Sequence, residues 1–413
     1  MYFCTMNSPL NKKKIINDPV YGFINIPSVG IFDLLEHPYL QRLRRIKQLG
    51  LSNLVYPGAE HTRFSHAVGA MFLMNQALDV LKQKGETISE EEFEASLSAI
   101  LLHDIGHSPF SHCLEHFFFK ESHEDVSLEL MKRIGVSQIT LDIFSNNYPK
   151  RFLHQLVSSQ VDTDRLDYLT RDSFFTGVSE GVIGTERIIK MLSVKDDELV
   201  IEQKGIYSIE KFIISRRLMY WQVYMHKTVV SADILLKTIL KRARDIQEKG
   251  IDVIRNISPC FAYFFKNGVR TFKEGKAIEC FTSIDDSDIW NAVKVWTKSE
   301  DKILSYLSNC LENRCLGKIQ IQDKPFTIQD IEEVVNKLYN KDDNKITKQE
   351  LKEYFVLTDE LRNKAYSFED HKINILFKNG EIKEICNASD QLDENFLRKE
   401  IKKYYLYKLP INR

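Results

Sequence analysis

The sequence has neither a long hydrophobic run nor an excess of charge of one sign. Its 57 lysines and arginines face 58 aspartates and glutamates, which leaves a formal net charge of −1 at pH 7. No overall field would therefore draw the chain to nucleic acid or to an anionic membrane, and an anionic ligand would need a local basic cluster. No apolar segment has the length to span a bilayer, and the start lacks the basic and apolar regions of a signal peptide.

Paired cysteines are missing as well. The seven cysteines are odd in number, scattered along the chain, and never in the CxxC spacing of a structural zinc ribbon. This usage argues against a disulfide framework and is typical of a reducing compartment. We therefore expect a cytoplasmic protein that does not enter a membrane.

Most of the sequence has helical periodicity. Phe93, Leu97 and Ile100 form one apolar face that leads directly to His103. Residues 208–246 contain neither proline nor glycine, and their pattern predicts a helix throughout. With 43% hydrophobic and 28% charged residues in 413 positions, the composition is that of a soluble globular protein.

Two stretches depart from the helical pattern. Residues 20–32 (VYGFINIPSVGIF) predict short extended pieces broken by glycine and proline. After about residue 320, the alternating segment INILFKNGEIKEI predicts a hairpin with a two-residue turn at Asn379-Gly380. We predict a mainly α fold, with a large helical domain over residues 1–320 and a smaller α+β lobe over residues 321–413.

The segment LLHDIGHSPFSH concentrates groups that bind metals. His103 and His107 lie four residues apart, on one face of an expected helix, and Asp104 is adjacent. Imidazole nitrogen and carboxylate oxygen together suit a divalent transition metal. Pro109 is expected to end the helix soon afterwards, so that His112 folds back over the site. The alternative is a set of surface histidines at a helix end, but most of the eleven histidines lie between His61 and His123, which favours a metal site.

Two further segments complete a known signature. His66 stands in PGAEHTRFSHAVGAMF and Asp164 in VDTDRLDYLTRDSFF. With His103 and Asp104, they resemble the H…HD…D signature of the HD-domain metal-dependent phosphohydrolases. The segments NDPVYGFI, QRLRRIKQLG, SHED and YMHKTV occur in the order found in one branch, the deoxynucleoside triphosphate triphosphohydrolases, which includes the vertebrate SAM-and-HD-domain enzyme and bacterial relatives. The resemblance covers roughly residues 12–320, without a preceding SAM domain.

The resemblance implies an HD-domain helical core and a catalytic divalent metal. Fe, Mn or Zn would be held by His66, His103, Asp104 and Asp164, with Mg possible beside the nucleotide, and would activate a water molecule. His112 is then the candidate general acid, with His107 close by. The assisting acid and the His-Glu pair correspond to Glu115, His123 and Glu124. Relatives usually carry Asp in place of Glu115, and a solvated loop at residues 121–125 is the alternative for the pair.

The same resemblance assigns a substrate site. Asp164, Tyr168 and Asp172 are spaced along one helix face, where Tyr168 would disfavour a ribose 2′-hydroxyl and Asp172 would bind the 3′-hydroxyl with Gln48. Arginine and lysine side chains would neutralise the triphosphate. Arg216, Tyr224 and Lys227 are expected on one face of one helix, with a solvated basic stripe as the alternative. The full expected set is Gln48, Arg63, Arg165, Tyr168, Asp172, Arg216, Tyr224, His226 and Lys227.

A second nucleotide site follows from the family as well. In the vertebrate relative an effector nucleotide binds between subunits and orders a tetramer, so we expect a homo-oligomer. The matching residues are Lys14, Ile15, Asn17, Glu36, Gln41 and Arg44, with Arg314 from a neighbouring chain. Relatives often have Asp in place of Glu36, and a plain amphipathic basic helix at residues 41–48 is the alternative.

The leading functional hypothesis is metal-dependent hydrolysis of deoxynucleoside triphosphates to deoxynucleoside and triphosphate, activated by a nucleotide effector. Three alternatives remain open. The first is a phosphatase of nucleoside monophosphates, the second is a nuclease that uses the same metal on DNA, and the third is a nucleotide-sensing oligomer with weak catalysis. Nucleic acid is therefore not excluded as a partner.

Overall fold

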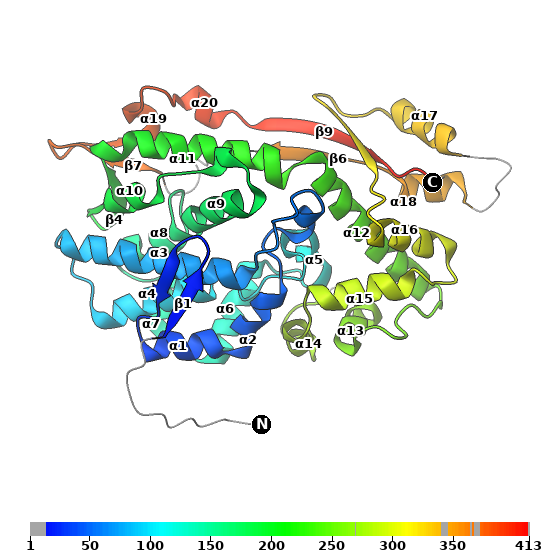
Figure 1. The fold of residues 1–413 in the computed structure, drawn as a ribbon, viewed down its shortest axis with the longest axis horizontal. Helices are drawn as coiled ribbons and strands as arrows, with labels where there is room; N and C mark the ends of the chain where they lie inside the picture. Colours follow the sequence, from blue (N-terminus) through cyan, green and yellow to red (C-terminus); the bar gives the residue numbers. More distant parts are fainter. Residues whose placement is uncertain (1–13, 269, 340–345, 364–365, 367–371, 412–413) are drawn as a thin grey trace.

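The protein is described by a computed structural model that covers residues 14–411, except 269, 340–345, 364–365 and 367–371. Helices dominate the described residues (Figure 1). The fold is mainly α, with small sheets and a strand-containing C-terminal part, as the sequence predicts. The boundary expected near residue 320 stays a prediction, because strand β5 (Lys318–Gln322) spans it and β7 (Asn374–Leu376) pairs with a strand of the preceding segment.

Helix α3 (Arg63–Gln83) is the central element and packs against α4 (Glu90–Leu102) and α9 (Thr163–Thr176). It begins with a capping box, in which Thr62 accepts from the Ser65 N–H and Ser65 accepts from the Thr62 N–H. Capping boxes of this kind satisfy two backbone donors that the first turn leaves free. Gly69 is required where α3 meets α9, since a Cβ there would lie 2.0 Å from the Asp167 carboxylate.

The other helices surround this centre. In the first part of the chain they are α1 (Val29–Glu36), α2 (Pro38–Arg42), α5 (Glu115–Phe118), α6 (His123–Ile134), α7 (Gln138–Phe144), α8 (Arg151–Val157) and α10 (Thr185–Lys190). The second part contains α11 (Ile206–Met219), α12 (Lys227–Glu248), α13 (Pro259–Asn267), α14 (Ala277–Ser283), α15 (Asp286–Trp296) and α16 (Lys302–Glu312). The C-terminal part adds α17 (Ile328–Leu338), α18 (Lys348–Tyr354), α19 (Ile385–Ala388) and α20 (Glu394–Arg398).

The helix predicted over residues 208–246 is interrupted, so that prediction is wrong in the middle. Helix α11 passes into a π-helical turn at Tyr220–Tyr224, and α12 starts only at Lys227. His226 has an extended backbone (φ −61°, ψ 133°), and its side chain accepts from the Thr228 N–H as the cap of α12. Arg216, Tyr224 and Lys227 therefore do not share one face of one helix.

The N-terminal segment is extended only in part. Strands β1 (Ile15–Asp18) and β2 (Gly22–Asn25) form an antiparallel hairpin, in which Gly22 adopts φ +73°. Ser28 then accepts from the Ile31 N–H and caps α1. The prediction that residues 29–32 are extended is therefore wrong. These residues are helical because Ser28 caps the start of α1, which the positions of glycine and proline do not indicate.

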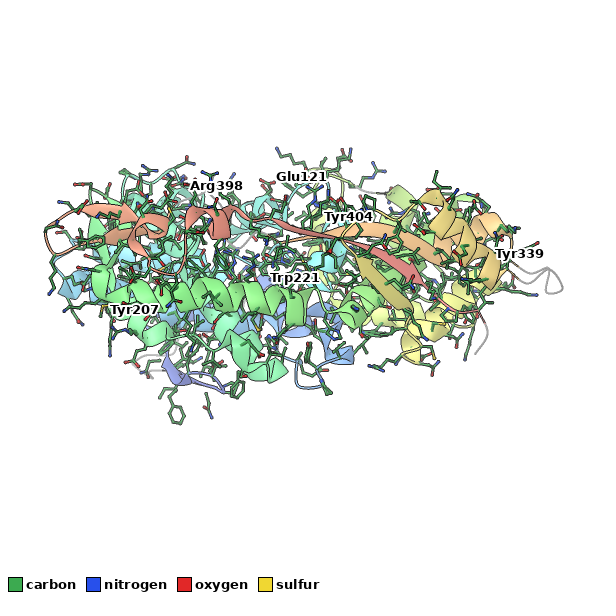
Figure 2. All side chains as sticks on the ribbon, turned by 90° about the horizontal axis from the view of Figure 1, so that it is seen from above. Glu121, Tyr207, Trp221, Tyr339, Arg398 and Tyr404 are labelled. Atoms are coloured by element: carbon green, nitrogen blue, oxygen red, sulfur yellow. The ribbon has the colours of Figure 1, made fainter. Side chains whose placement is uncertain are left out.

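Two small sheets lie along one edge of the molecule (Figure 1). One has the order β3 (Leu192–Lys195), β4 (Glu198–Glu202), β7 and β8 (Ile382–Glu384). The other has the order β5, β9 (Ile401–Lys408) and β6 (Val356–Asn363). Viewed from above, β9 runs beside the π-helical turn, where the Lys403 ammonium lies 4.8 Å from the Trp221 ring centre (Figure 2).

The predicted hairpin between β7 and β8 is confirmed, but its turn is longer than two residues. Leu376 pairs with Ile382, and the Gly380 N–H donates to the Phe377 carbonyl at 2.9 Å. Gly380 adopts φ +84°, and the Phe377 N–H returns to the Glu381 carbonyl at 2.9 Å. A turn followed by a left-handed glycine is the usual form of the three-residue hairpin loop.

Candidate metal centre and active-site cavity

Four predicted metal ligands converge from three separate segments. The His66 Nε2 atom, on α3, lies 3.1 Å from Asp164 Oδ1 on α9 and 3.3 Å from His103 Nε2. Asp104 Oδ1 lies 3.3 Å from His103 Nε2, and its Oδ2 lies 3.8 Å from His66 Nε2. The ligand atoms of His66, His103 and Asp164 all lie within 4.8 Å of one another.

The far sides of both imidazoles are fixed by acceptors. His66 Nδ1 lies 2.7 Å from Asp167 Oδ2, and His103 Nδ1 lies 2.6 Å from the Ile100 carbonyl. Asp167 is itself bound by the buried Arg171, which also pairs with Asp18 at 2.8 Å. Such outer partners place the proton on Nδ1 and leave Nε2 free for a metal.

The electrostatics of the site favour a cation. Burial alone would lower the pKa of His66, but its hydrogen bonds to Asp164 and Asp167 raise that pKa to about 10. Burial would raise the pKa of Asp164, yet His103 and His66 hold it below its ordinary value. The carboxylates thus hold positive charge in place, and a divalent ion would supply such charge. The residues therefore fit a divalent metal of the type that imidazole and carboxylate ligands prefer.

The loop after α4 differs from the prediction in its geometry. Helix α4 ends at Leu102 with His103 as its cap, so His103 and His107 do not lie on one helix face and Pro109 does not end the helix. Gly106 lets the loop approach α6, because a Cβ there would lie 2.3 Å from the His123 carbonyl. Phe110 and Ser111 follow with φ of 57° and 56°, two left-handed residues in succession. This sharp reversal turns the loop toward the cavity.

Two side chains that the sequence did not single out hold this loop. Asp286 accepts from the Phe110 N–H at 2.7 Å and from the Lys47 N–H at 2.9 Å. Arg42 is fully buried and donates to the His107 carbonyl at 3.0 Å and to the Ile284 carbonyl at 2.7 Å. No local pattern in one sequence reveals these pairs, since the partners are far apart along the chain.

The predicted catalytic residues form a second cluster beside the metal ligands. Glu115 lies 3.1 Å from His112 Nδ1 and 2.5 Å from His123 Nδ1. These two hydrogen bonds lower the pKa of Glu115. The His123 ring stacks on the buried His107 ring with centres 3.9 Å apart, and His123 Nε2 lies 3.4 Å from Glu124. The His112 side chain is 68% exposed, so it is open to a ligand.

The protonation of His107 differs from what a general acid needs. Burial and then the neighbouring Arg63 guanidinium lower the pKa of His107 well below its ordinary value. The His107 imidazole is therefore neutral at neutral pH. Its Nε2 lies 3.4 Å from Asp104 Oδ1, which makes it a partner of the metal-ligand cluster.

One cavity of about 470 Å³ brings most of these groups together. Its wall contains three candidate metal ligands, His103, Asp104 and Asp164. The predicted substrate residues on the same wall are Gln48, Arg63, Arg165, Tyr168, Asp172 and Tyr224. The Oε1 atom of Gln48 is buried and has no hydrogen-bond partner among the described residues, so it is an acceptor available to a ligand.

Cations and hydroxyls at the cavity are held in defined positions. Arg63 donates to Asp104 and, through Nε, to Ser111 Oγ at 2.8 Å. Arg165 donates to the Ser159 carbonyl at 2.6 Å. The Tyr224 hydroxyl donates to Asp172 Oδ2 at 2.7 Å.

Three predicted substrate residues do not line this cavity. Arg216 lies on α11, with its guanidinium carbon 6.0 Å from the Tyr220 ring centre. His226 is occupied as the cap of α12, and Lys227 is the first residue of that helix. The π-helical turn between the two helices, by contrast, contributes Tyr220 and Tyr224 to the cavity wall.

The predicted effector residues lie mostly on the surface near β1, α1 and α2. Ile15, Asn17, Glu36 and Arg44 are exposed, and Lys14 Nζ stands 3.1 Å from the Phe32 ring centre. Arg44 donates to Gln41 Oε1 at 2.8 Å and lies 3.5 Å from the Phe64 ring centre. Arg314 is exposed and donates to the Leu54 carbonyl of its own chain at 2.7 Å.

The segment QRLRRIKQ does not form the regular amphipathic helix considered as an alternative. Helix α2 spans only Pro38–Arg42, and a single 3₁₀ turn at Leu43–Arg45 follows. Of its arginines, Arg42 is buried while Arg44 and Arg45 are exposed. Arg42 therefore holds the loop that carries His107, and Arg44 and Arg45 lie on the surface.

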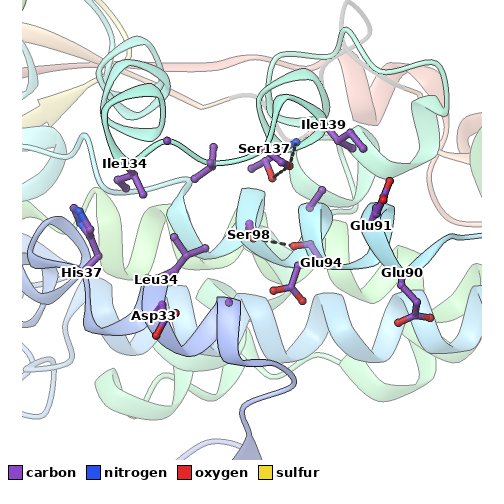
Figure 3. Close-up of a pocket in the computed structure, with 15 residues that line it drawn as sticks. Asp33, Leu34, His37, Glu90, Glu91, Glu94, Ser98, Ile134, Ser137 and Ile139 are labelled. Atoms are coloured by element: carbon purple, nitrogen blue, oxygen red, sulfur yellow. Dashed lines mark hydrogen bonds between the residues drawn. The ribbon is translucent and has the colours of Figure 1, made fainter. Parts of the chain in front are cut away.

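A larger groove of about 870 Å³ contains none of the candidate metal ligands and lies between α1, α4 and the α6–α7 connection (Figure 3). Its rim carries Asp33, Glu90, Glu91 and Glu94, and neither lysine nor arginine is among its described lining residues. An acidic rim repels phosphate. The smaller cavity, with its arginines and metal ligands, is therefore the candidate active site.

Comparison with known proteins identifies the family of the chain. Residues 63–171 match the HD domain, and residues 183–257 match an HD-associated region. The protein YwfO of Bacillus subtilis is 35% identical over 322 residues, which cover 75% of this chain and 72% of YwfO. A crystal structure of a phosphohydrolase from Bacteroides thetaiotaomicron has a TM-score of 0.91 at 49% identity, covering 96% of this chain and 99% of that one. The chain belongs to the HD-domain phosphohydrolase family and is a hydrolase.

A more distant relative carries a specific name. The deoxynucleoside triphosphate triphosphohydrolase SAMHD1 homolog of Dictyostelium discoideum is 32% identical over 254 residues. The match covers 55% of this chain and 49% of that protein.

Among the residues that the structure describes, none of the helices combines the length and apolarity that crossing a bilayer requires.

Proposed function

We propose that the chain hydrolyses deoxynucleoside triphosphates to deoxynucleoside and triphosphate. The observation that carries this proposal is the single cavity that holds candidate metal ligands beside Gln48, Tyr168 and Asp172. A tyrosine ring, a carboxylate and an unpartnered amide oxygen suit a deoxyribose with a free 3′-hydroxyl. The resemblance to the SAMHD1 homolog supports the same substrate.

Binding of the triphosphate is assigned to the arginines of the cavity wall. Arg63 and Arg165 present guanidinium groups to phosphate oxygens, which they bind in a planar, charge-assisted way. Both arginines are anchored by protein acceptors, so they need little reordering when a ligand arrives. A divalent metal held by His66, His103, Asp104 and Asp164 would supply an activated water for attack on phosphorus.

We assign protonation of the leaving 5′-oxygen to His112. Water oxygen bonds to the α-phosphorus, the bond from that phosphorus to the 5′-oxygen breaks, and the 5′-oxygen takes a proton. Glu115 binds His112 through Nδ1, which leaves Nε2 of the exposed imidazole to donate that proton. Glu115 also binds His123 and so fixes the two imidazoles relative to each other.

Product analysis tests the proposal. The metal-loaded protein is incubated with the four deoxynucleoside triphosphates, the matching monophosphates and single-stranded DNA, and products are separated by ion-exchange chromatography. Release of intact triphosphate with deoxynucleoside supports the proposal. Orthophosphate from monophosphates would identify a phosphatase, shortened DNA a nuclease, and turnover of none of them a nucleotide sensor. An Asp164→Asn variant is the control for contaminating activity.

We also propose that a nucleotide effector binds at the exposed surface formed by Lys14, Asn17, Glu36, Gln41 and Arg44 and shifts the chain toward an active homotetramer. Arg44 stands over Phe64, two residues before His66, which connects this surface to the metal ligands. Activity on one nucleotide should then rise when a second is added. Arg44→Ala should remove that rise and leave metal content unchanged. A rate and an oligomer size that ignore every added nucleotide would contradict the effector proposal.

A further inference from the structure

His61 makes two contacts that together frame one end of the cavity. Its Nε2 lies 2.8 Å from Asp172 Oδ1, and its backbone carbonyl accepts from the Gln48 N–H at 3.0 Å. Asp172 and Gln48 both line the cavity, whereas His61 lies behind them and does not line it. One residue thus connects the two cavity-wall groups that we assign to the 3′-hydroxyl.

The His61–Asp172 pair is almost completely buried. The His61 side chain is 0% exposed, and that of Asp172 is 2% exposed. A carboxylate oxygen accepts hydrogen bonds, so His61 Nε2 is the donor in this contact. Tyr224 donates to the other Asp172 oxygen at 2.7 Å. The two donors, one on each oxygen, fix the plane of the carboxylate and direct its remaining lone pairs toward the cavity.

The surroundings of His61 also hold the ring in place. The imidazole stacks on Phe175 with ring centres 4.6 Å apart and an interplanar angle of 19°. The loop before it lies close to α9, since a Cβ on Gly58 would lie 2.5 Å from the Phe175 carbonyl. Lys47 and Thr62 form a β-bridge beside the Gln48 contact. Ring, backbone and bridge therefore leave His61 little freedom.

The same histidine carries an energetic cost that stability alone does not explain. Its Nδ1 is buried and has no hydrogen-bond partner among the described residues. A buried polar nitrogen without a partner is destabilising and calls for an explanation. An apolar residue would fill the space without this cost, but it could not donate to Asp172.

We propose that His61 is the positioning residue of the sugar subsite and that it acts on the substrate through Asp172 and Gln48. The inference rests on the proposed function, because the subsite is defined by a deoxynucleotide. It predicts that His61 affects recognition of the 3′-hydroxyl and leaves the triphosphate contacts unchanged.

The test compares two ligands that differ only in the 3′-hydroxyl. For the full-length, metal-loaded protein, kcat/KM is measured with dATP, and the inhibition constant is measured with 2′,3′-dideoxyadenosine triphosphate. His61→Leu keeps the bulk of the side chain and removes the donor. We expect kcat/KM for dATP to fall on the order of tenfold to a hundredfold, as for a lost hydrogen bond to a charged group. The inhibition constant of the dideoxy compound should change less than about threefold, because that compound has no 3′-hydroxyl to lose.

Three variants separate positioning from general damage. His61→Gln retains an N–H in reach of Asp172 and should restore most of the activity. Phe174→Leu changes an exposed ring on the same helix, next to the stacking partner Phe175, and should stay near wild type. In an Asp172→Ala background, His61→Leu should lower kcat/KM for dATP no further. The effects of two residues are not additive when one acts through its contact with the other.

Each outcome decides between the ideas. If the dideoxy inhibition constant worsens by the same factor as kcat/KM for dATP, His61 has a merely structural role and the inference is overturned. If His61→Gln is no better than His61→Leu at equal thermal stability, the donor role is overturned. A wild-type protein that releases no triphosphate from dATP would overturn the proposed function itself, and the sugar subsite with it.

Discussion

The Asp286 carboxylate accepts the Phe110 N–H at 2.7 Å and so ties the start of α15 to the loop that carries His107 and His112. The other oxygen accepts the Lys47 N–H, next to Gln48 of the cavity wall. A single buried carboxylate therefore holds two segments of the candidate active site in place, although it neither lines the cavity itself nor contacts a candidate metal ligand.

Removal of this carboxylate should loosen the site and destabilise the protein. Asp286→Ala leaves two backbone donors unsatisfied, one of them buried, and should cost about 2–4 kcal/mol of unfolding free energy. Urea denaturation measures the stability and kcat measures the site. Glu279→Ala, an exposed acid on the adjacent α14, is the control and should change stability by less than about 0.5 kcal/mol. Equal stability of the two variants would contradict the role of Asp286.

Two candidate metal ligands should differ in their effect on stability. Asp104→Ala and Asp164→Asn should both lose bound metal, as measured by plasma mass spectrometry. Asp104 also pairs with Arg63, whose side chain is only 3% exposed. Loss of one partner of a buried ion pair costs about 3–5 kcal/mol, so Asp104→Ala should unfold much earlier in urea than Asp164→Asn.

A double substitution checks the cause of that difference. Arg63→Met combined with Asp104→Leu removes both charges and should recover most of the stability without recovering metal. The ion-pair explanation fails if the double variant is as unstable as Asp104→Ala. Full metal content in Asp164→Asn would count against the ligand assignment.

Tyr168 should determine the choice between deoxyribose and ribose. Its ring lies in the cavity wall, edge-on to Tyr224 with ring centres 6.3 Å apart. Tyr168→Ala opens space for a 2′-hydroxyl and should reduce the ratio of kcat/KM for dATP over ATP by about tenfold or more. Tyr168→Phe keeps the ring and should keep the ratio. An unchanged ratio in the alanine variant would remove Tyr168 from this role.

Asp233, on the cavity wall, should make stability depend on pH. Burial raises its pKa to about 6, above the ordinary value of 3.8. Because the folded chain holds this proton more tightly than the unfolded chain, the contribution to stability is fully present below pH 3.8 and is lost as the pH rises through about 6.

Asp233→Asn should remove this loss of stability at higher pH, because asparagine does not ionise. Relative to wild type, the variant should gain on the order of 1–2 kcal/mol between about pH 5 and about pH 8. Thermal melts at several pH values measure the gain. Asp33→Asn, at an exposed position on the acidic groove, is the control and should show a flat difference; a flat difference for Asp233→Asn as well would contradict the raised pKa.

Local signals in the sequence account for much of the fold. The apolar face of Phe93, Leu97 and Ile100 predicts a helix that leads to His103, and α4 confirms it. The break before α12 could not be predicted, because it contains no proline or glycine and uses His226 as a cap, a residue type that rarely starts helices. Its cause is tertiary packing, which periodicity does not report.

The candidate site, too, could be predicted only where its residues are close together in the sequence. The spacing of Asp164, Tyr168 and Asp172 predicts one face of a helix, and all three residues line the cavity. His61, Arg42 and Asp286 escaped prediction because their roles depend on partners in distant segments. The sequence places His61 four residues after Pro57, in a tight loop just before α3, which is a weak signal for a residue held in a fixed position. Only the fold shows that this loop lies against Asp172 and Phe175.

The parallel pairing of β4 with β7 places Ile201 beside Ile375. Contacts between positions so far apart in sequence form late, because the intervening chain must be ordered first. A recombinant fragment cut near residue 320 would keep every residue assigned to the metal, the substrate and the effector. It would also expose the backbone edge of β4 that β7 otherwise covers, and such an open edge recruits other chains into aggregates. Attempts to isolate the catalytic half by truncation should therefore fail through insolubility, with the catalytic groups themselves intact.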